Sequence, residues 1–188
     1  VLLAPNLSQD SVSLEANLMK TDWSCKASAL KIARQQSWNN FLNAIAQFFE
    51  VRHFLAVDTP ILVDNPGPEP TIDVFKTAYK NGRQVQDKFL ITSPELSLKK
   101  IVSETLMPVY EMTSVFRNNE HSSKHRPEFA MLEWYRPFSS LEDIKHDVQE
   151  LVLFLIKKLA IKNKKPKFEQ TSFSEILKKK FNFEFTPQ

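Results

Sequence analysis

The residues best equipped for chemistry lie between Val115 and Arg136, in the run VFRNNEHSSKHRPEFAMLEWYR. An apolar stretch ends at Arg117, eleven polar or turn-forming residues follow, and an apolar segment with a period of two resumes at Phe129. This order predicts two β-strands joined by a charged loop.

Alternation along a strand determines which of these side chains share a face. One face of the second strand carries Phe129, Met131, Glu133 and Tyr135, and the opposite face carries Ala130, Leu132, Trp134 and Arg136. One face of the first strand carries Glu111, Thr113, Val115 and Arg117. If the two polar faces coincide, they present an arginine fork, two carboxylates and aromatic rings. Such a surface suits a ligand with phosphates, an aromatic base and an amine.

Composition narrows the class of protein. The chain has 188 residues, enough for one domain with a buried core, and its 42% hydrophobic and 25% charged residues are typical of a globular protein. The formal net charge of +3 permits an anionic ligand but does not by itself indicate nucleic-acid binding. The glycines are only Gly67 and Gly82, which excludes a Walker loop and a Rossmann fingerprint. Phosphate binding would therefore depend on side chains.

The expected location of the protein follows from its cysteine and its apolar stretches. The single cysteine, Cys25, excludes an internal disulfide and fits a reducing compartment. No stretch approaches the roughly 18 apolar residues of a membrane span, and residues 1–10 lack the order of a signal peptide. We therefore expect a soluble, cytoplasmic protein without a membrane partner.

Periodicity and turn signals predict the elements that come first in the chain. Residues 1–26 show no period and are predicted to form an N-terminal arm, whereas apolar spacing predicts an amphipathic helix over 27–53. Residues 54–62, FLAVDTPIL, predict a short strand in which Pro60 indicates an edge or an interface. The proline-rich residues 64–70 predict a loop.

Two more elements precede the central strand pair. Asn81 and Gly82 predict the turn of a hairpin between strands at 73–79 and 88–91. The sequence Thr92-Ser93-Pro94-Glu95 predicts a helix start in which Thr92 is the cap and Glu95 closes a capping box. That helix is predicted to reach Thr105.

The remaining elements complete an α+β pattern. Ser139 or Ser140 is predicted to cap a long helix that reaches Ile161, and a short helix is predicted over 174–180. The six lysines within 157–167 indicate a solvated helix end, with binding to RNA or to an acidic protein as the alternative. Together the elements predict helices flanking an antiparallel sheet, within one domain over 27–188.

With these elements in order, the chain resembles the catalytic domain of class II aminoacyl-tRNA synthetases, in their lysyl branch. The first helix with FLAVDTPIL is similar to motif 1, TSPELSLKK to the lysyl-type segment that follows it, and VFRNNEHSSKHRPEFAMLEWYR to motif 2. The resemblance covers roughly residues 35–160. It implies an incomplete class II catalytic domain, ATP-dependent formation of an aminoacyl-adenylate, Mg²⁺ as a cofactor, and a homodimer with Pro60 at the interface.

Within this class, the expected member is a lysyltransferase that modifies elongation factor P. About 35 residues precede the motif 1 helix, too few for the anticodon-binding barrel of lysyl-tRNA synthetases, and HRPEFAMLEWYRPF is especially similar to the elongation factor P enzymes. The expected reaction transfers a lysyl or β-lysyl group to a lysine of that factor. The alternatives are a fragment of a lysyl-tRNA synthetase acting on tRNA-Lys, a non-catalytic paralogue that binds ATP, lysine or a protein partner, and an RNA-binding fragment.

The resemblance also implies roles for single residues. Arg117 would be catalytic and bind the α-phosphate of ATP, His125 would approach the γ-phosphate, and Phe129 would stack on adenine. Glu95, Glu133 and Tyr135 would bind the amino groups of the lysyl substrate. Asn119 stands at the ATP-recognition position where the family usually has Glu, and its amide carbonyl can still accept a hydrogen bond.

Some of these residues also have simpler structural explanations, and the sequence departs from the family pattern in places. Glu95 is also explained as a capping-box residue, Phe129 as a core residue and His125 as a loop histidine. Motif 3, a glycine-rich segment ending in arginine, has no match in this sequence. The pyrophosphate-side arginine and the metal-binding carboxylates would lie in that missing part, so no residue here is assigned to a metal. Asn119 and the missing motif favour the non-catalytic alternative.

Overall fold

The computed structural model describes residues 29–67, 69–120, 122–161 and 166–183. The arm predicted over 1–26 lies outside the described residues, as do His121 and four residues of the lysine-rich segment. The described elements follow in chain order as α2 (Ala29–Glu50), β1 (Leu55–Ala56), β2 (Leu62–Val63), β3 (Lys76–Asn81), β4 (Gln84–Leu90), α3 (Glu95–Thr105), β5 (Val109–Phe116), β6 (Glu128–Tyr135), α4 (Leu141–Lys158) and α5 (Phe173–Phe181).

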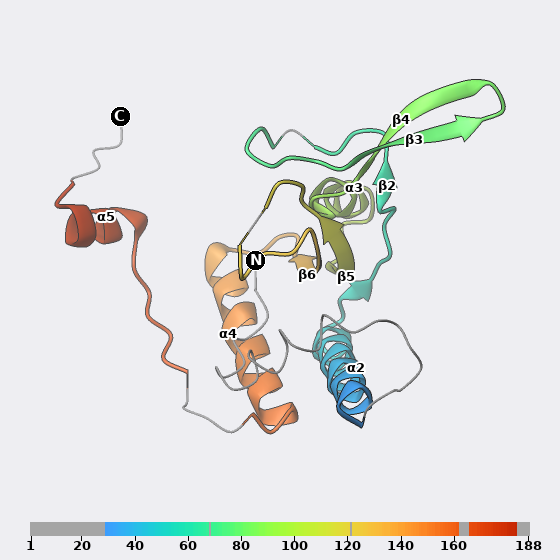
Figure 1. Cartoon of the computed structure of the whole chain (residues 1–188). Helices are drawn as coiled ribbons and strands as arrows, with labels where there is room; N and C mark the ends of the chain where they lie inside the picture. Colours follow the sequence, from blue (N-terminus) through green and yellow to red (C-terminus); the bar gives the residue numbers. More distant parts are fainter. Residues whose placement is uncertain (1–28, 68, 121, 162–165, 184–188) are drawn as a thin grey trace.

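The strands form two three-stranded sheets, and helices flank them (Figure 1). The first sheet has the order β1-β5-β6 and the second has the order β2-β4-β3. The predicted α+β class and the predicted strand pair around motif 2 are therefore confirmed. One pairing differs from a purely antiparallel sheet, because β1 runs parallel to β5. The connection between them contains the whole second sheet and α3, which is long enough for the crossover that a parallel pair requires.

The single strand predicted over residues 54–62 is wrong. Its ends pair with different sheets, since Leu55–Ala56 pairs with β5 and Leu62–Val63 pairs with β4. Between them, the backbone N–H and the hydroxyl of Thr59 each donate a hydrogen bond of 2.8 Å to the carboxylate of Glu111 on β5. Pro60 has no N–H to donate to a ladder, and it lies exposed in the gap between the two strands.

The hairpin of β3 and β4 confirms the signal at Asn81 and Gly82, with the turn one residue later than the pair itself. Asn81 pairs with Gln84 as the last rung, so Gly82 and Arg83 form the two-residue turn. Gly82 has φ of 61°, the left-handed conformation that such a turn needs at its first position. The hairpin extends away from the rest of the molecule in Figure 1.

The capping box predicted at Thr92 and Glu95 is wrong. Pro94 is the N-cap residue of α3, and no side chain caps that helix. Thr92 is buried, and its hydroxyl lies 3.5 Å from a carboxylate oxygen of Glu69, to which it donates. The carboxylate of Glu95 instead pairs with Lys99 one turn along the helix. The capping-box explanation for Glu95 is thereby removed.

The last two helices match the sequence closely. Ser140 caps α4, and its hydroxyl and backbone N–H form a capping box with Asp143. A second capping box, between Ser172 and Glu175, starts α5. Figure 1 shows α5 set apart from the two sheets.

The largest core lies where α2 and α4 cover one face of the β5–β6 pair. Its buried residues are Ile45, Phe48, Phe49, Phe54, Tyr110, Leu132 and Leu151. The ring of Phe49 stacks on Tyr110 with centroids 4.4 Å apart, and Trp134 packs beside them. The opposite face carries a smaller cluster of Ile91, Val115 and Met131, against which Phe129 packs. The predicted division of β6 into two faces is confirmed.

Among the described residues, no helix combines the length and the apolarity that a membrane crossing requires.

Because Phe49 is fully buried among four other rings, replacing it with Ala should leave a cavity in the main core. We expect Phe49→Ala to lower the free energy of unfolding by about 3–5 kcal/mol, measured by urea denaturation. The matched control is Phe173→Ala on α5, a ring that is 70% exposed, which should change stability by less than about 0.5 kcal/mol. Equal effects of the two substitutions would contradict this assignment of the core.

Candidate active site

Arg117 follows the last residue of β5 and opens the loop to β6. Its backbone N–H donates to the carbonyl of Pro127, which closes the base of the loop. The guanidinium carbon lies 5.3 Å from the centre of the Phe129 ring. The Arg117 Nε is buried and has no hydrogen-bond partner among the described residues, and Nη1 lies 4.0 Å from Glu120. An arginine with an unpaired buried donor is well suited to receive an anionic ligand.

Phe129 stands opposite Val115 near the start of β6. One part of its ring packs on the small core cluster, and the Arg117 guanidinium lies over the ring. The alternative that Phe129 is a core residue is therefore correct in part, because the ring packs on the core cluster and also lies beside the guanidinium. An aromatic ring and a guanidinium held together in this way can bind a base and a phosphate of one nucleotide.

Of the two loop residues expected to contact ATP, Asn119 is bonded to a distant segment of the chain, whereas His125 is bonded within the loop. Asn119 has φ of 59°, and its side-chain nitrogen donates to the carboxylate of Asp73 at 3.0 Å. The backbone of Asp73 also bridges to Asn118, so the loop is tied to the segment before β3. His125 is exposed, and its Nδ1 lies 2.6 Å from the Ser122 hydroxyl. The Asn119 amide nitrogen is thus already used within the chain.

Glu133 and Tyr135 lie together on the face of β6 opposite the main core. The Tyr135 hydroxyl donates a hydrogen bond of 2.7 Å to Glu133. Burial raises the pKa of Glu133 above its usual range, the hydrogen bond from Tyr135 opposes this rise, and the nearby Glu95 carboxylate adds to it. Burial and the bond to Glu133 raise the pKa of Tyr135 as well. A half-buried carboxylate with such a cost of ionisation is a candidate for binding a cationic ligand.

Glu95 reaches the same region from α3. Its carboxylate pairs with Lys99 at the i, i+4 spacing, and the charges of both residues act on Glu133. The structure therefore brings together Glu95, Glu133 and Tyr135, as the resemblance implied. Lys99 is a member of this cluster that sequence reasoning missed. The signal that could have found it is the i, i+4 spacing of a glutamate and a lysine on one helix.

Glu111 stands directly opposite Glu133, so the polar faces of the two strands coincide as expected. One of the two expected carboxylates is nevertheless engaged within the protein. Both oxygens of Glu111 accept hydrogen bonds from Thr59, and the side chain is buried. The second carboxylate of the cluster comes from α3, as Glu95.

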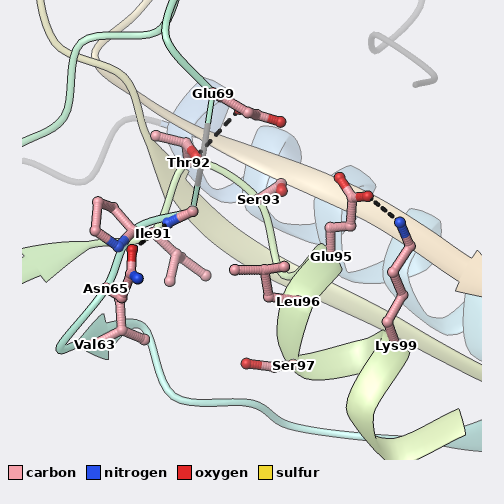
Figure 2. Close-up of a pocket in the computed structure, with 12 residues that line it drawn as sticks. Val63, Asn65, Glu69, Ile91, Thr92, Ser93, Glu95, Leu96, Ser97 and Lys99 are labelled. Carbon is pink, nitrogen blue, oxygen red and sulfur yellow. Dashed lines mark hydrogen bonds and ion pairs between the residues drawn. The ribbon is translucent and has the colours of Figure 1, made fainter. Parts of the chain in front are cut away.

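A pocket of about 390 Å³ borders this cluster, between the start of α3 and the loop that follows β2. Glu69, Thr92, Glu95 and Lys99 lie on its wall, and Figure 2 shows the carboxylates of Glu69 and Glu95 on neighbouring sides. Its size falls within the range of sites for small ligands. Glu69 was not expected at the site, because its loop carries no periodic pattern.

Two ends of the β6 face thus differ in chemistry. Arg117 and Phe129 lie at the loop end, and Glu133 follows four residues along the strand, which corresponds to about 13 Å. A ligand that used both ends would need an anionic, aromatic part and a cationic part separated by that distance. Among the described residues, no group of three His, Cys, Asp or Glu side chains could hold a metal ion.

Comparison with known proteins gives a consistent family. The model of the family described as tRNA synthetases class II (D, K and N) matches residues 21–185. The chain is 34% identical over 145 residues to a protein of Aquifex aeolicus named as an elongation factor P--(R)-beta-lysine ligase homolog, covering 77% of the chain and 47% of that protein. It is 31% identical over 140 residues to the elongation factor P--(R)-beta-lysine ligase of Haemophilus ducreyi, covering 73% of the chain and 42% of that protein.

The chain spans less than half the length of these two curated relatives. Among solved structures, the asparaginyl-tRNA synthetase of Pyrococcus horikoshii, complexed with asparaginyl-adenylate, superposes with a TM-score of 0.58. This likeness has 23% sequence identity and covers 66% of the chain and 28% of that structure. It supports the fold.

The bond from Tyr135 to Glu133 leads to a prediction about titration. Because the hydroxyl lowers the pKa of Glu133, Tyr135→Phe should raise that pKa further, so the carboxyl should take up its proton at a higher pH during acidification. The measurement is a ¹³C NMR titration of the labelled glutamate carboxyls. Tyr79→Phe, on the exposed hairpin, serves as the control and should leave Glu133 unchanged. An unchanged or lower Glu133 pKa in Tyr135→Phe would contradict the described hydrogen bond.

Proposed function

The chain belongs to the class II tRNA synthetase family of the D, K and N type, and we propose that it activates lysine or β-lysine with ATP and transfers the acyl group to a lysine of elongation factor P. The observation that carries the proposal is the cluster of Glu95, Glu133 and Tyr135 on the same face as Arg117 and Phe129. A lysyl substrate has two ammonium groups and a carboxylate, and a pair of carboxylates is their natural counterpart.

The proposed first step joins the amino acid to AMP. The substrate carboxylate attacks the α-phosphorus of ATP in line, a P–O bond forms, and the bond to the departing pyrophosphate breaks. Arg117 supports this role because its Nε–H, which has no partner among the described residues, and its fork can neutralise charge that develops on the α-phosphate. Phe129 would hold adenine, and the separation of about 13 Å along β6 suits an adenylate whose amino groups reach Glu133.

In the proposed second step, the amine of a lysine side chain of elongation factor P attacks the acyl carbonyl. An amide bond forms, the bond between the acyl carbon and AMP breaks so that AMP leaves, and the attacking nitrogen releases one proton to solvent or to AMP. The names of relatives that are 31–34% identical support this acceptor. Because ATP and a translation factor are the other reactants, the reaction would take place in the cytoplasm.

Other positions keep narrower proposed roles. His125 is exposed on the loop after Arg117, where it can approach the outer phosphates of ATP. Asn119 can offer its side-chain carbonyl and its second amide N–H to ATP while the first N–H remains on Asp73. The family uses Mg²⁺ with ATP, but the described residues provide no cluster to hold it, and no step above depends on a metal ligand of this chain.

We also propose a homodimer through the segment around Pro60. Exposed apolar side chains lie on both sides of this proline in the sequence, namely Val51, Leu55, Ile61 and Leu62. Such a concentration of exposed aliphatic residues is typical of an interface. The buried link between Thr59 and Glu111 holds the segment against β5, so an interface there would be anchored to the proposed site.

A non-catalytic paralogue that binds ATP or lysine is the second candidate. The observation in its favour is the Asn119 side chain, which is tied to Asp73 at a position where the family usually has Glu. A lysyl-tRNA synthetase fragment is the third, since the matching family model includes the lysyl enzymes.

The test of activation is ATP–pyrophosphate exchange by the complete gene product, with lysine, β-lysine and the other amino acids in turn. We expect exchange with lysine or β-lysine, and we expect Arg117→Ala to lower kcat/KM at least about 100-fold through lost stabilisation of the transition state. Arg83→Ala, in the exposed hairpin turn, is the matched control and should retain full exchange. Exchange with no amino acid would favour the non-catalytic paralogue, and exchange that survives Arg117→Ala would refute the role of Arg117.

The test of the acceptor uses the amino acid that supports exchange, in radiolabelled form. We expect label on elongation factor P and none on tRNA-Lys when both are present, because the relatives named above are elongation factor P ligases. Mass spectrometry should then place the added group on one lysine of the factor, and replacing that lysine with Arg should abolish labelling. Label on tRNA-Lys instead would favour the synthetase alternative.

A further inference from the structure

Lys99 lies on α3 one turn after Glu95 and forms an ion pair with it (Figure 2). The Lys99 side chain is 56% exposed and the Glu95 side chain is 38% exposed, so the pair lies at the rim of the 390 Å³ pocket that both residues line. An exposed i, i+4 pair contributes little to stability, which leaves the position of Lys99 without a strong structural explanation.

The other side of the cluster carries a carboxylate that is costly to ionise. Glu133 is half-buried on β6, and the groups that face it are the Tyr135 hydroxyl, the Glu95 carboxylate and the Lys99 ammonium. Across the strand pair, both carboxylate oxygens of Glu111 already accept hydrogen bonds from Thr59. Among these described groups, Lys99 is the single cation beside two carboxylates.

Two carboxylates that share a partly buried region repel each other, and one of them tends to take up a proton. A protonated carboxyl attracts an ammonium group far less than an ionised one does. A site for a diamine therefore benefits from a positively charged group beside its carboxylates before the ligand arrives. The Lys99 ammonium is such a group, since it forms an ion pair with Glu95 and its charge also acts on Glu133.

We propose that Lys99 is a positioning residue of the amino-acid site, which holds Glu95 in place by its ion pair and supplies beside the carboxylates the positive charge that a diamine ligand later replaces. This inference rests on the proposed function. The exposed lysine can turn to solvent when the ammonium of the ligand enters, because its Nζ bonds no described side chain other than Glu95. Lys99 thereby sets the pH range over which the site accepts lysine or β-lysine.

The pH dependence has a definite sign. The Lys99 charge lowers the pKa of Glu133, whereas burial and Glu95 raise it. Removing the charge should raise the pKa of Glu133, so the loss of ligand affinity on acidification should begin at a higher pH. Ionisation of Glu133 favours ligand binding, and affinity is therefore present above its pKa and is lost as the pH falls through it.

The experiment is calorimetric titration of the complete gene product with lysine and with β-lysine, between about pH 5 and about pH 8. Lys99→Gln should weaken binding about fivefold at neutral pH and more at acidic pH, and it should move the midpoint of the acidic loss to higher pH. Lys99→Arg should restore both the affinity and the midpoint. Lys100→Gln removes the same charge from the next residue, which lies on a different side of the helix, and should change neither. Circular dichroism would verify that each variant is folded.

The outcomes separate this inference from the function on which it rests. Failure of the unsubstituted protein to bind either amino acid would overturn the proposed function and this inference with it. Binding by the unsubstituted protein with the same affinity and the same pH midpoint in Lys99→Gln would overturn the role of Lys99 alone. A loss that Lys99→Arg does not restore would also overturn it, since the proposal requires only the positive charge at this position.

Discussion

The register of β5 against β6 is the constraint on which the candidate binding face depends. The ladder runs from Val109 opposite Tyr135 to Phe116 opposite Glu128, without a bulge. It directs Leu132 and Trp134 toward the helices and leaves Glu133 and Tyr135 on the opposite face. A slip of one residue would exchange those faces, because side chains alternate along a strand. The aromatic core around Phe49 therefore also determines where the carboxylate of the site can lie.

The site is made at some cost to the folded state. Glu133 is held in a half-buried position that disfavours its charge, and Arg117 keeps a buried Nε without a partner among the described residues. Groups in such positions are expensive unless a ligand supplies what the protein does not. The two carry opposite charges at opposite ends of one face. A ligand with phosphates at one end and ammonium groups at the other would satisfy both.

Polar links between distant segments hold this face in place. Thr59 and Glu111 join the proline segment to β5, and Asp73 joins the start of the hairpin region to Asn118 and Asn119 in the motif 2 loop. One of these links uses Asn119, which the family resemblance assigns to ATP, and the other uses Thr59, to which the resemblance assigns no role. Asn119 illustrates the difference, because a residue expected to contact ATP also has a structural task within the loop.

The sequence by itself determined the elements whose signals are local. Alternation located the paired strands and their two faces, Ser139 or Ser140 indicated the start of α4, and the motifs around Arg117 and Glu133 indicated the family. Only the tertiary structure showed that residues 54–62 divide between two sheets and that Thr59 donates hydrogen bonds to Glu111. Only the tertiary structure showed that Glu95 forms no capping box and that Lys99 and Glu69 line the pocket at the candidate site. The physical reason is that each of these depends on which partner lies nearby in space. Thr59 and Glu111 are 52 residues apart, and no period within either segment can predict the hydrogen bond between them.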